Sequence, residues 1–269
     1  MAPVVAAVLP HPPLLVPELA GTAAAELDPL RTACHEALAT VVAAAELTIL
    51  VGDGPVWGVP EPSAPGSFAP YGADVEVTLP TAPADLDPPE LRAPVQPPDL
   101  PWSEAELPAP AWLPDLPLSL AVAAYLLAGL DLAPARLLAA TVPTSLGPGA
   151  AAAIGRALTD AARGPAGDGP VGLVVMADLS ACRTERAPGA YRAAAADVDA
   201  SVAEAVRAGK PARLLDLEPA LASDLMVGGR VPLQVLAGAL EPEPAVHGRV
   251  LYEDAPYGVG YLVAILTAP

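Results

Sequence analysis

The sequence predicts an α/β protein with a mostly parallel central sheet and helices on both faces. Short apolar runs of strand length alternate along the chain with longer Ala-rich runs that have helical spacing. The short runs are continuously apolar instead of alternating with polar residues, which is typical of parallel strands buried on both faces. We expect the 269 residues to form a single domain over positions 1–269, because a chain of this length can bury one large core.

The N-terminal part reads as a β-α-β unit. Val4–Leu9 is the first predicted strand and Leu47–Val51 the second. Between them, Thr22 is expected to cap a helix whose apolar residues recur every three or four positions. That stripe consists of Leu27, Leu30, Cys34, Leu38, Val41 and Ala45.

The alternation of helices and strands continues in the second half of the chain. Helices are predicted at Leu118–Gly129, Gly149–Ala162 and Pro232–Leu240, with another carrying the stripe Val198, Val202 and Val206. Strands are predicted at Leu137–Val142, Val171–Met176, Arg249–Tyr252 and Gly260–Leu266.

A Pro-rich excursion interrupts this pattern at about Gly58–Pro117. Proline removes backbone donors and clashes with preceding carbonyls, so we expect an irregular segment that wraps the core or covers one end of the sheet. It should contain one strand-like piece, Val75–Leu79, and no helix longer than a turn or two before Leu118. Its aromatic residues Tyr71, Trp102 and Trp112 are expected to anchor it onto the sheet.

Composition narrows the classes of partner. The formal net charge is −18 with only 13 basic residues, which disfavours nucleic acid because phosphates would repel the surface. The longest apolar stretch, Leu116–Leu130, is too short to span a membrane, and no signal peptide is recognisable. The two cysteines form no C-x-x-C motif, so we expect a cytoplasmic protein with reduced thiols. No exposed heptad or apolar strip identifies an interface, so the sequence leaves open whether the protein forms a homo-oligomer.

Polar residues follow two of the predicted strands and are candidates for a functional site. His11 lies in His-Pro-Pro directly after the first strand, and Asp178 and Ser180 follow the strand that ends at Met176, with Arg183 close behind. Open α/β folds bind ligands beyond the carboxyl ends of their strands. The alternatives are a turn histidine packed under its prolines, and an Asp and a Ser that cap the next turn.

Several segments together resemble one family. They are the opening Leu-Pro-His-Pro-Pro, Val51-Gly52-Asp53-Gly54, Ala177-Asp178-Leu179-Ser180, Gly229-Arg230-Val231-Pro232 and Tyr257-Gly258-Val259-Gly260-Tyr261. Their order and spacing look like the class III extradiol dioxygenase (LigB-type) superfamily, which also holds the Memo-like proteins. The Ala-rich composition of the chain is similar to that of a subgroup of this superfamily that is common in actinomycetes. The resemblance covers almost the whole chain apart from the Pro-rich excursion. It implies Fe(II) held by two histidines and a carboxylate, an acid-base histidine, and opening of a catechol ring by O₂.

Only the first of these site residues carries over to this chain. His11 matches the first metal-binding histidine, whereas Asp53 is the nearest ligand where the second histidine is expected. Ala181 stands at the acid-base position, and Met226, Val227 and Gly228 stand where a carboxylate or cysteine should lie.

Two functions therefore stay open. The preferred hypothesis is a noncatalytic relative that binds a small molecule or a protein partner in a crevice formed by His11, Asp53, Asp178, Ser180 and Arg183, with Tyr257 from the tail. Arg183 would pair with an anionic group of the ligand. The alternative is an active Fe(II) dioxygenase that recruits ligands such as Asp53, His247 or Glu253. Both hypotheses require His11, Asp53 and Asp178 to meet at one end of a single sheet.

Overall fold

The computed structural model describes residues 4–80, 110–130, 136–166, 169–241, 243 and 245–268. Its strands are β1 (Val4–Leu9), β2 (Leu47–Gly54), β3 (Gly58–Pro60), β4 (Pro65–Ser67), β5 (Glu76–Thr78), β6 (Ala111–Leu113), β7 (Leu137–Pro143), β8 (Val171–Met176), β9 (His247–Asp254) and β10 (Tyr261–Thr267). Its α-helices are α1 (Pro17–Ala20), α2 (Asp28–Ala44), α4 (Leu118–Ala128), α5 (Pro148–Ala166), α6 (Ala194–Arg207), α7 (Pro219–Asp224) and α8 (Arg230–Leu240). Short 3₁₀ turns are η1 (Pro13–Leu15), η2 (Gly21–Leu27), η3 (Ala69–Tyr71) and η5 (Pro211–Asp216).

Within these residues, eight strands form one sheet in the order β6-β3-β7-β2-β8-β1-β10-β9. The central strands β7, β2, β8 and β1 are all parallel to one another, and β10 and β9 continue the sheet in antiparallel fashion. The prediction of an α/β fold with a mostly parallel sheet is confirmed. Because all six residues of β8 are buried, this strand has the continuously apolar sequence of a strand covered on both faces.

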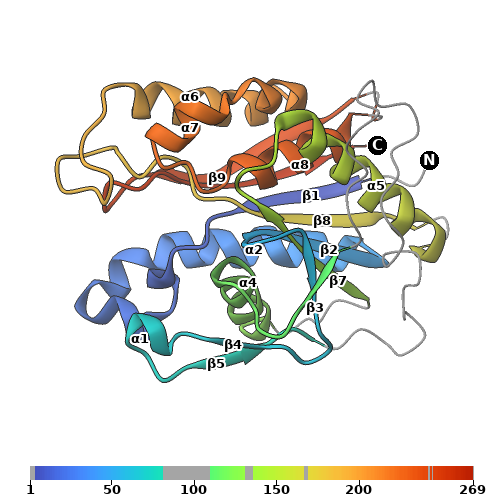
Figure 1. Cartoon of the computed structure of the whole chain (residues 1–269), viewed down its shortest axis with the longest axis horizontal. Coiled ribbons are helices and arrows are strands. Elements are labelled where there is room, and N and C mark those ends of the chain that lie inside the picture. Colours follow the sequence, from blue (N-terminus) through green and yellow to red (C-terminus); the bar gives the residue numbers. More distant parts are fainter. Residues whose placement is uncertain are drawn as a thin grey trace.

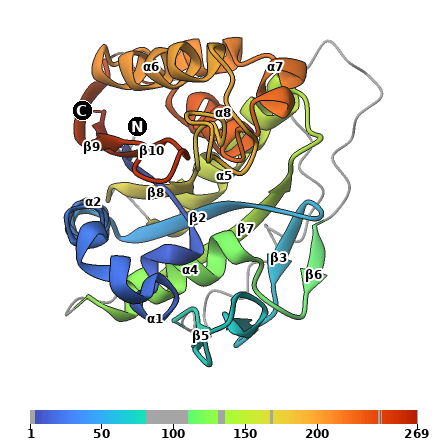
Figure 2. The same ribbon diagram turned by 90° about the vertical axis from the view of Figure 1, so that its left-hand side faces the viewer.

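The helices cover the sheet in two layers (Figures 1 and 2). One face carries α5, α6 and α8, whose apolar residues pack with Val8, Ile49 and Val175 of the strands. The other face carries α2 and α4, which pack with Leu9 and Leu50. Alternate residues of each strand therefore point into two separate apolar cores, because successive side chains of a strand point to opposite faces of the sheet.

The first helix begins later than the sequence predicts. Thr22 lies exposed in η2, and α2 begins at Asp28 with Pro29 in its first turn. Proline is favoured there because its missing N–H would have no partner in the first turn of a helix. The predicted apolar stripe from Leu27 to Ala45 is nevertheless buried throughout.

The Pro-rich excursion is more regular than predicted in its described parts. β3 and β6 pair with each other and extend the main sheet beyond β7, while β4 and β5 form a separate two-stranded sheet. β5 coincides with the expected piece Val75–Leu79. Residues 81–109, which include Trp102 and about half of the excursion in which no long helix is expected, lie outside the described residues.

The aromatic anchors of the excursion differ from the expected ones. Tyr71 and Trp112 are both about half exposed, whereas Phe68 is fully buried and meets Tyr125 of α4 edge to face. Trp57, at the entrance to the excursion, is also buried. The count of aromatic residues could not show which of them face inward, because that depends on the short strands on either side.

No helix in the described part of the chain is both long and apolar enough to cross a membrane.

Candidate functional site

Three parallel strands bring His11, Asp53 and Asp178 together at their carboxyl ends. β2, β8 and β1 are neighbours in that order, and each of these residues lies within two positions of the last residue of its strand. Nε2 of His11 lies 3.2 Å from Oδ1 of Asp53 and 3.9 Å from Oδ2 of Asp178. The expected meeting of the three residues at one end of a single sheet is therefore observed.

Asp53 is positioned by close packing at the end of β2. A Cβ on Gly52 would lie 2.2 Å from Oγ of Ser119 in α4, and one on Gly54 would lie 2.7 Å from Cβ of Thr141 in β7. Only glycine permits these approaches. The Ser119 hydroxyl then donates to the Asp53 carbonyl at 2.7 Å. The Gly-Asp-Gly sequence thus lets the strand end lie close to its neighbours while the carboxylate turns toward His11.

Asp178 is positioned by the loop that follows β8. Its backbone carbonyl accepts from Gly229 N–H at 2.7 Å, and its Oδ1 accepts from the His11 backbone N–H at 2.8 Å. One residue earlier, Ala177 N–H donates to the Leu9 carbonyl. The carboxylate therefore binds the backbone of His11 as well as facing its ring.

The imidazole of His11 is buried between two partly exposed carboxylates. His11 is 6% exposed, while the side chains of Asp53 and Asp178 are 29% and 19% exposed. Burial acts to lower the pKa of His11, but the charge of Asp178 and the hydrogen bond and charge of Asp53 outweigh it and raise the pKa to about 9. His11 is therefore a cation at neutral pH. Its buried Nδ1 has no hydrogen-bond partner among the described residues.

Two further side chains lie within the electrostatic reach of Asp178. Continuing the register in which Val8 of β1 faces Ala264 of β10 places Tyr261 beside His11. Burial and then the negative charge of Asp178 raise the pKa of Tyr261, and the same two causes raise the pKa of Cys34 in α2. Burial also raises the pKa of Asp178 itself, which His11 lowers and Asp53 raises further.

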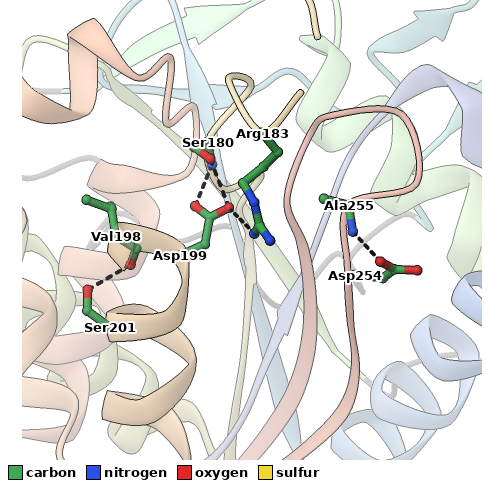
Figure 3. A network of polar contacts seen from close by, with 7 residues as sticks. All are labelled: Ser180, Arg183, Val198, Asp199, Ser201, Asp254 and Ala255. Atoms are coloured by element: carbon green, nitrogen blue, oxygen red, sulfur yellow. Dashed lines mark hydrogen bonds and ion pairs between the residues drawn. The ribbon is translucent and has the colours of Figure 1, made fainter. Parts of the chain in front are cut away.

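Ser180 and Arg183 do not face this cluster, which corrects the expected composition of the crevice. Both bind Asp199 of α6, which is nearly fully buried (Figure 3). Oδ1 of Asp199 accepts from Ser180 N–H at 2.9 Å, and Oδ2 accepts from the Ser180 hydroxyl at 2.8 Å and from Arg183 Nη1 at 2.9 Å. Nη1 of Arg183 already has a carboxylate partner within the chain, and the expected pairing of Arg183 with an anionic group of a ligand stays a prediction.

The Asp199 contacts hold the loop that carries Asp178. Burial raises the pKa of Asp199, and the hydrogen bonds from Ser180 and Arg183 oppose that rise without cancelling it. A Cβ on Gly260 would lie 2.3 Å from Oδ2 of Asp199, so the start of β10 closes directly over this carboxylate. Asp199 and Tyr261 are the site residues that sequence reasoning missed. The available signal for Asp199 was a lone carboxylate on the buried face of a helix, between Ala195 and Val202.

The other residues considered for the site are engaged elsewhere. The Tyr257 hydroxyl donates to Glu26 at 2.9 Å, and Glu253 pairs with Arg207. His247 begins β9 opposite Thr267, and Thr267 faces Val5 near the start of β1, so His247 lies at the opposite end of the sheet from His11. Neither His247 nor Glu253 completes a ligand set with His11.

Fe(II), which the LigB-type resemblance implies, does not fit the residues at this site. Among the described residues, no group of three or more His, Cys, Asp or Glu side chains is arranged to hold a metal ion. Ala181 and Val227 are buried apolar side chains, and Gly228 has none.

Comparison with known proteins bears on the fold alone. No protein-family model matches the chain, and no curated protein matches it. A solved structure described as the crystal structure of uncharacterized protein JW3007 from Escherichia coli K12 is similar over 98% of this chain and 99% of that chain, with a TM-score of 0.54 and 16% sequence identity. This similarity supports the α/β architecture across nearly the full length of both chains.

Proposed function

We propose that the chain binds a small polar molecule at the carboxyl ends of β1, β8 and β2, and that it does not cleave catechols. The observation that carries this proposal is the position of His11 beside two carboxylates, one of which, Asp53, stands where the LigB-type resemblance implies a second histidine. Ligands of open α/β folds bind in this part of the sheet. The LigB-type relationship is itself part of the proposal.

The charges of the cluster indicate the chemistry of the ligand. Two carboxylates surround one imidazolium, so the cluster favours a neutral or cationic molecule over an anion. Oδ2 of Asp53 accepts no hydrogen bond from any described residue, and its side chain is partly exposed. An amine or a hydroxyl could donate to it.

The first experiment tests the exclusion of iron chemistry. Protein loaded with Fe(II) in the absence of oxygen should hold far less than one iron per chain and consume no O₂ with catechol. Elemental analysis and an oxygen electrode measure the two quantities. Stoichiometric iron, with O₂ uptake that is lost in His11→Ala, would instead establish the dioxygenase alternative.

The second experiment tests binding directly. Ethanolamine, glycerol and catechol are titrated into the protein while the imidazole resonances of His11 and His35 are followed by NMR. At least one of the three probes should move the His11 resonance, leave His35 unchanged, and lose its effect in Asp53→Asn. A His11 resonance that none of the probes moves would contradict the proposal and favour a protein partner at this surface.

A further inference from the structure

Arg230 is a buried cation without a carboxylate partner. It begins α8 and is 5% exposed. Nη1 donates to Oε1 of Gln234 at 2.9 Å, and Nη2 donates to the backbone carbonyl of Thr144. Both acceptors are neutral, and no ion pair joins Arg230 to any carboxylate in the described part of the chain.

This lack of a partner is unusual for a chain that has 31 acidic and 13 basic residues. Arg183 is more exposed than Arg230 and still has the buried carboxylate of Asp199. Burying a guanidinium without an opposing charge is unfavourable, because carbonyl oxygens replace only part of its hydration. Burial lowers the pKa of Arg230, and no carboxylate opposes this effect. The local charge balance therefore favours an anion.

Two helices begin beside this guanidinium. α5 follows the loop after β7 that contains Thr144, and α8 begins at Arg230 itself. The two helices pack side by side on one face of the sheet (Figure 2). Their contact is so close that a Cβ on Gly155 would lie 2.0 Å from the carbonyl oxygen of Val235. The bond from Arg230 to the Thr144 carbonyl places both helix starts at the same end of the sheet, just beyond β7.

The surroundings of the two helix starts leave room for a small ligand. A Cβ added to Gly147, just before α5, or to Gly228, just before α8, would meet no atom within 4 Å. Thr144 and Ser145 are exposed and carry hydroxyl groups. The N–H groups of Gly149 and Ala150 precede the first helical hydrogen bond of α5, which Ala151 N–H makes to the Gly147 carbonyl. These donors lie at the positive end of α5.

We propose that the Arg230 side chain and the first turn of α5 bind a small oxyanion, a carboxylate or a phosphate group. Arg230 supplies the buried positive charge, and Ser145 and the free backbone N–H groups supply further donors. This site differs from the His11 cluster in charge and adjoins it in position, because Gly229 N–H, directly before Arg230, donates to the Asp178 carbonyl. The cluster carries excess negative charge, and Asp178 acts there on Cys34 of the α2 layer, whereas Arg230 lies in the α5 and α8 layer.

The test is calorimetric titration of the full chain with inorganic phosphate and, separately, with acetate, each against chloride at the same ionic strength. One anion should bind per chain. Arg230→Met, which keeps the apolar stem and removes the charge, should weaken binding about tenfold or more, because a charge-assisted hydrogen bond is lost. Arg249→Met is the matched control and should bind as the wild type does, since that guanidinium lies exposed on the surface, where it pairs with Glu36.

A second variant keeps the test decisive if Arg230→Met does not fold. Ser145→Glu changes an exposed loop residue and places a negative charge beside the proposed anion, so it should weaken binding by a similar factor. Binding of phosphate alone would assign a phosphate ester, and binding of acetate alone a carboxylate. Absence of saturable binding for both anions, or binding that neither Arg230→Met nor Ser145→Glu weakens, would overturn the proposal.

Discussion

Replacing Asp53 by asparagine removes one negative charge beside the His11 imidazole while keeping the size of the side chain. In the wild type, His11 has a pKa of about 9 because Asp178 and Asp53 outweigh the effect of burial. In Asp53→Asn the charge of Asp53 is absent, so burial is opposed mainly by Asp178 and the pKa of His11 should fall. NMR titration of the His11 imidazole in both proteins measures this change directly.

The same pKa predicts how stability depends on pH. A group whose pKa is raised on folding stabilises the folded state fully below its unfolded pKa of 6.5, and this contribution is lost as the pH rises through the folded pKa of about 9. At about 1.4 kcal/mol for each unit of pKa, the rise from 6.5 to about 9 corresponds to about 3 kcal/mol. Denaturant unfolding should therefore show a fall of about this size in the free energy of unfolding between pH 6 and pH 9.5.

His11→Gln is the control for this pH dependence, because it removes the titrating group and should flatten the fall. His35 provides an internal reference in the NMR titration, since burial and the neighbouring Arg31 lower its pKa. A His11 resonance that titrates at or below pH 6.5, or at the same pH in wild type and Asp53→Asn, would refute the electrostatic account of the cluster.

Three further predictions concern packing and the buried polar groups. Asp199→Ala should lower the free energy of unfolding by about 3 to 5 kcal/mol in denaturant unfolding, because a buried ion pair loses one partner; a loss below about 1 kcal/mol would contradict this role. Gly238→Ala should destabilise by about 1 to 3 kcal/mol, since its Cβ would lie 2.0 Å from a backbone oxygen of α5, whereas Gly147→Ala has open space and should have little effect; equal effects of the two would argue against the α5–α8 contact. Cys34 and Cys182 are buried, and the pKa of Cys34 is raised, so a thiol reagent at neutral pH should modify both only after unfolding; fast labelling of the native protein would disagree with their burial.

Part of the candidate site could be predicted from the sequence because parallel strands end at a common edge. His11 and Asp178 each follow a continuous apolar run, and such runs predict buried strands whose carboxyl ends lie together. Asp53 follows the same rule after Leu47–Val51. The meeting of these three residues therefore depends on strand position alone, which periodicity indicates well.

The directions of individual side chains could not be predicted in this way. Ser180 and Arg183 follow the same strand end as Asp178, yet both turn toward Asp199. Which way they turn depends on α6 lying over that loop, a contact between segments separated by sixteen or more residues. The position of Tyr261 near the cluster likewise depends on the antiparallel pairing of β10 with β1.

The sequence by itself determined the alternation of strands and helices, the two-faced burial of the central strands, and the strong negative charge, because each of these follows from residue type and local spacing. The tertiary structure decided which charges are compensated. In the folded chain Arg183 pairs with the carboxylate of Asp199, whereas Arg230 donates only to neutral acceptors. His11 lies between two carboxylates. The physical reason is that the pKa and the pairing of a charged group depend on distances between residues far apart in the chain, and only packing of the helices on the sheet fixes those distances.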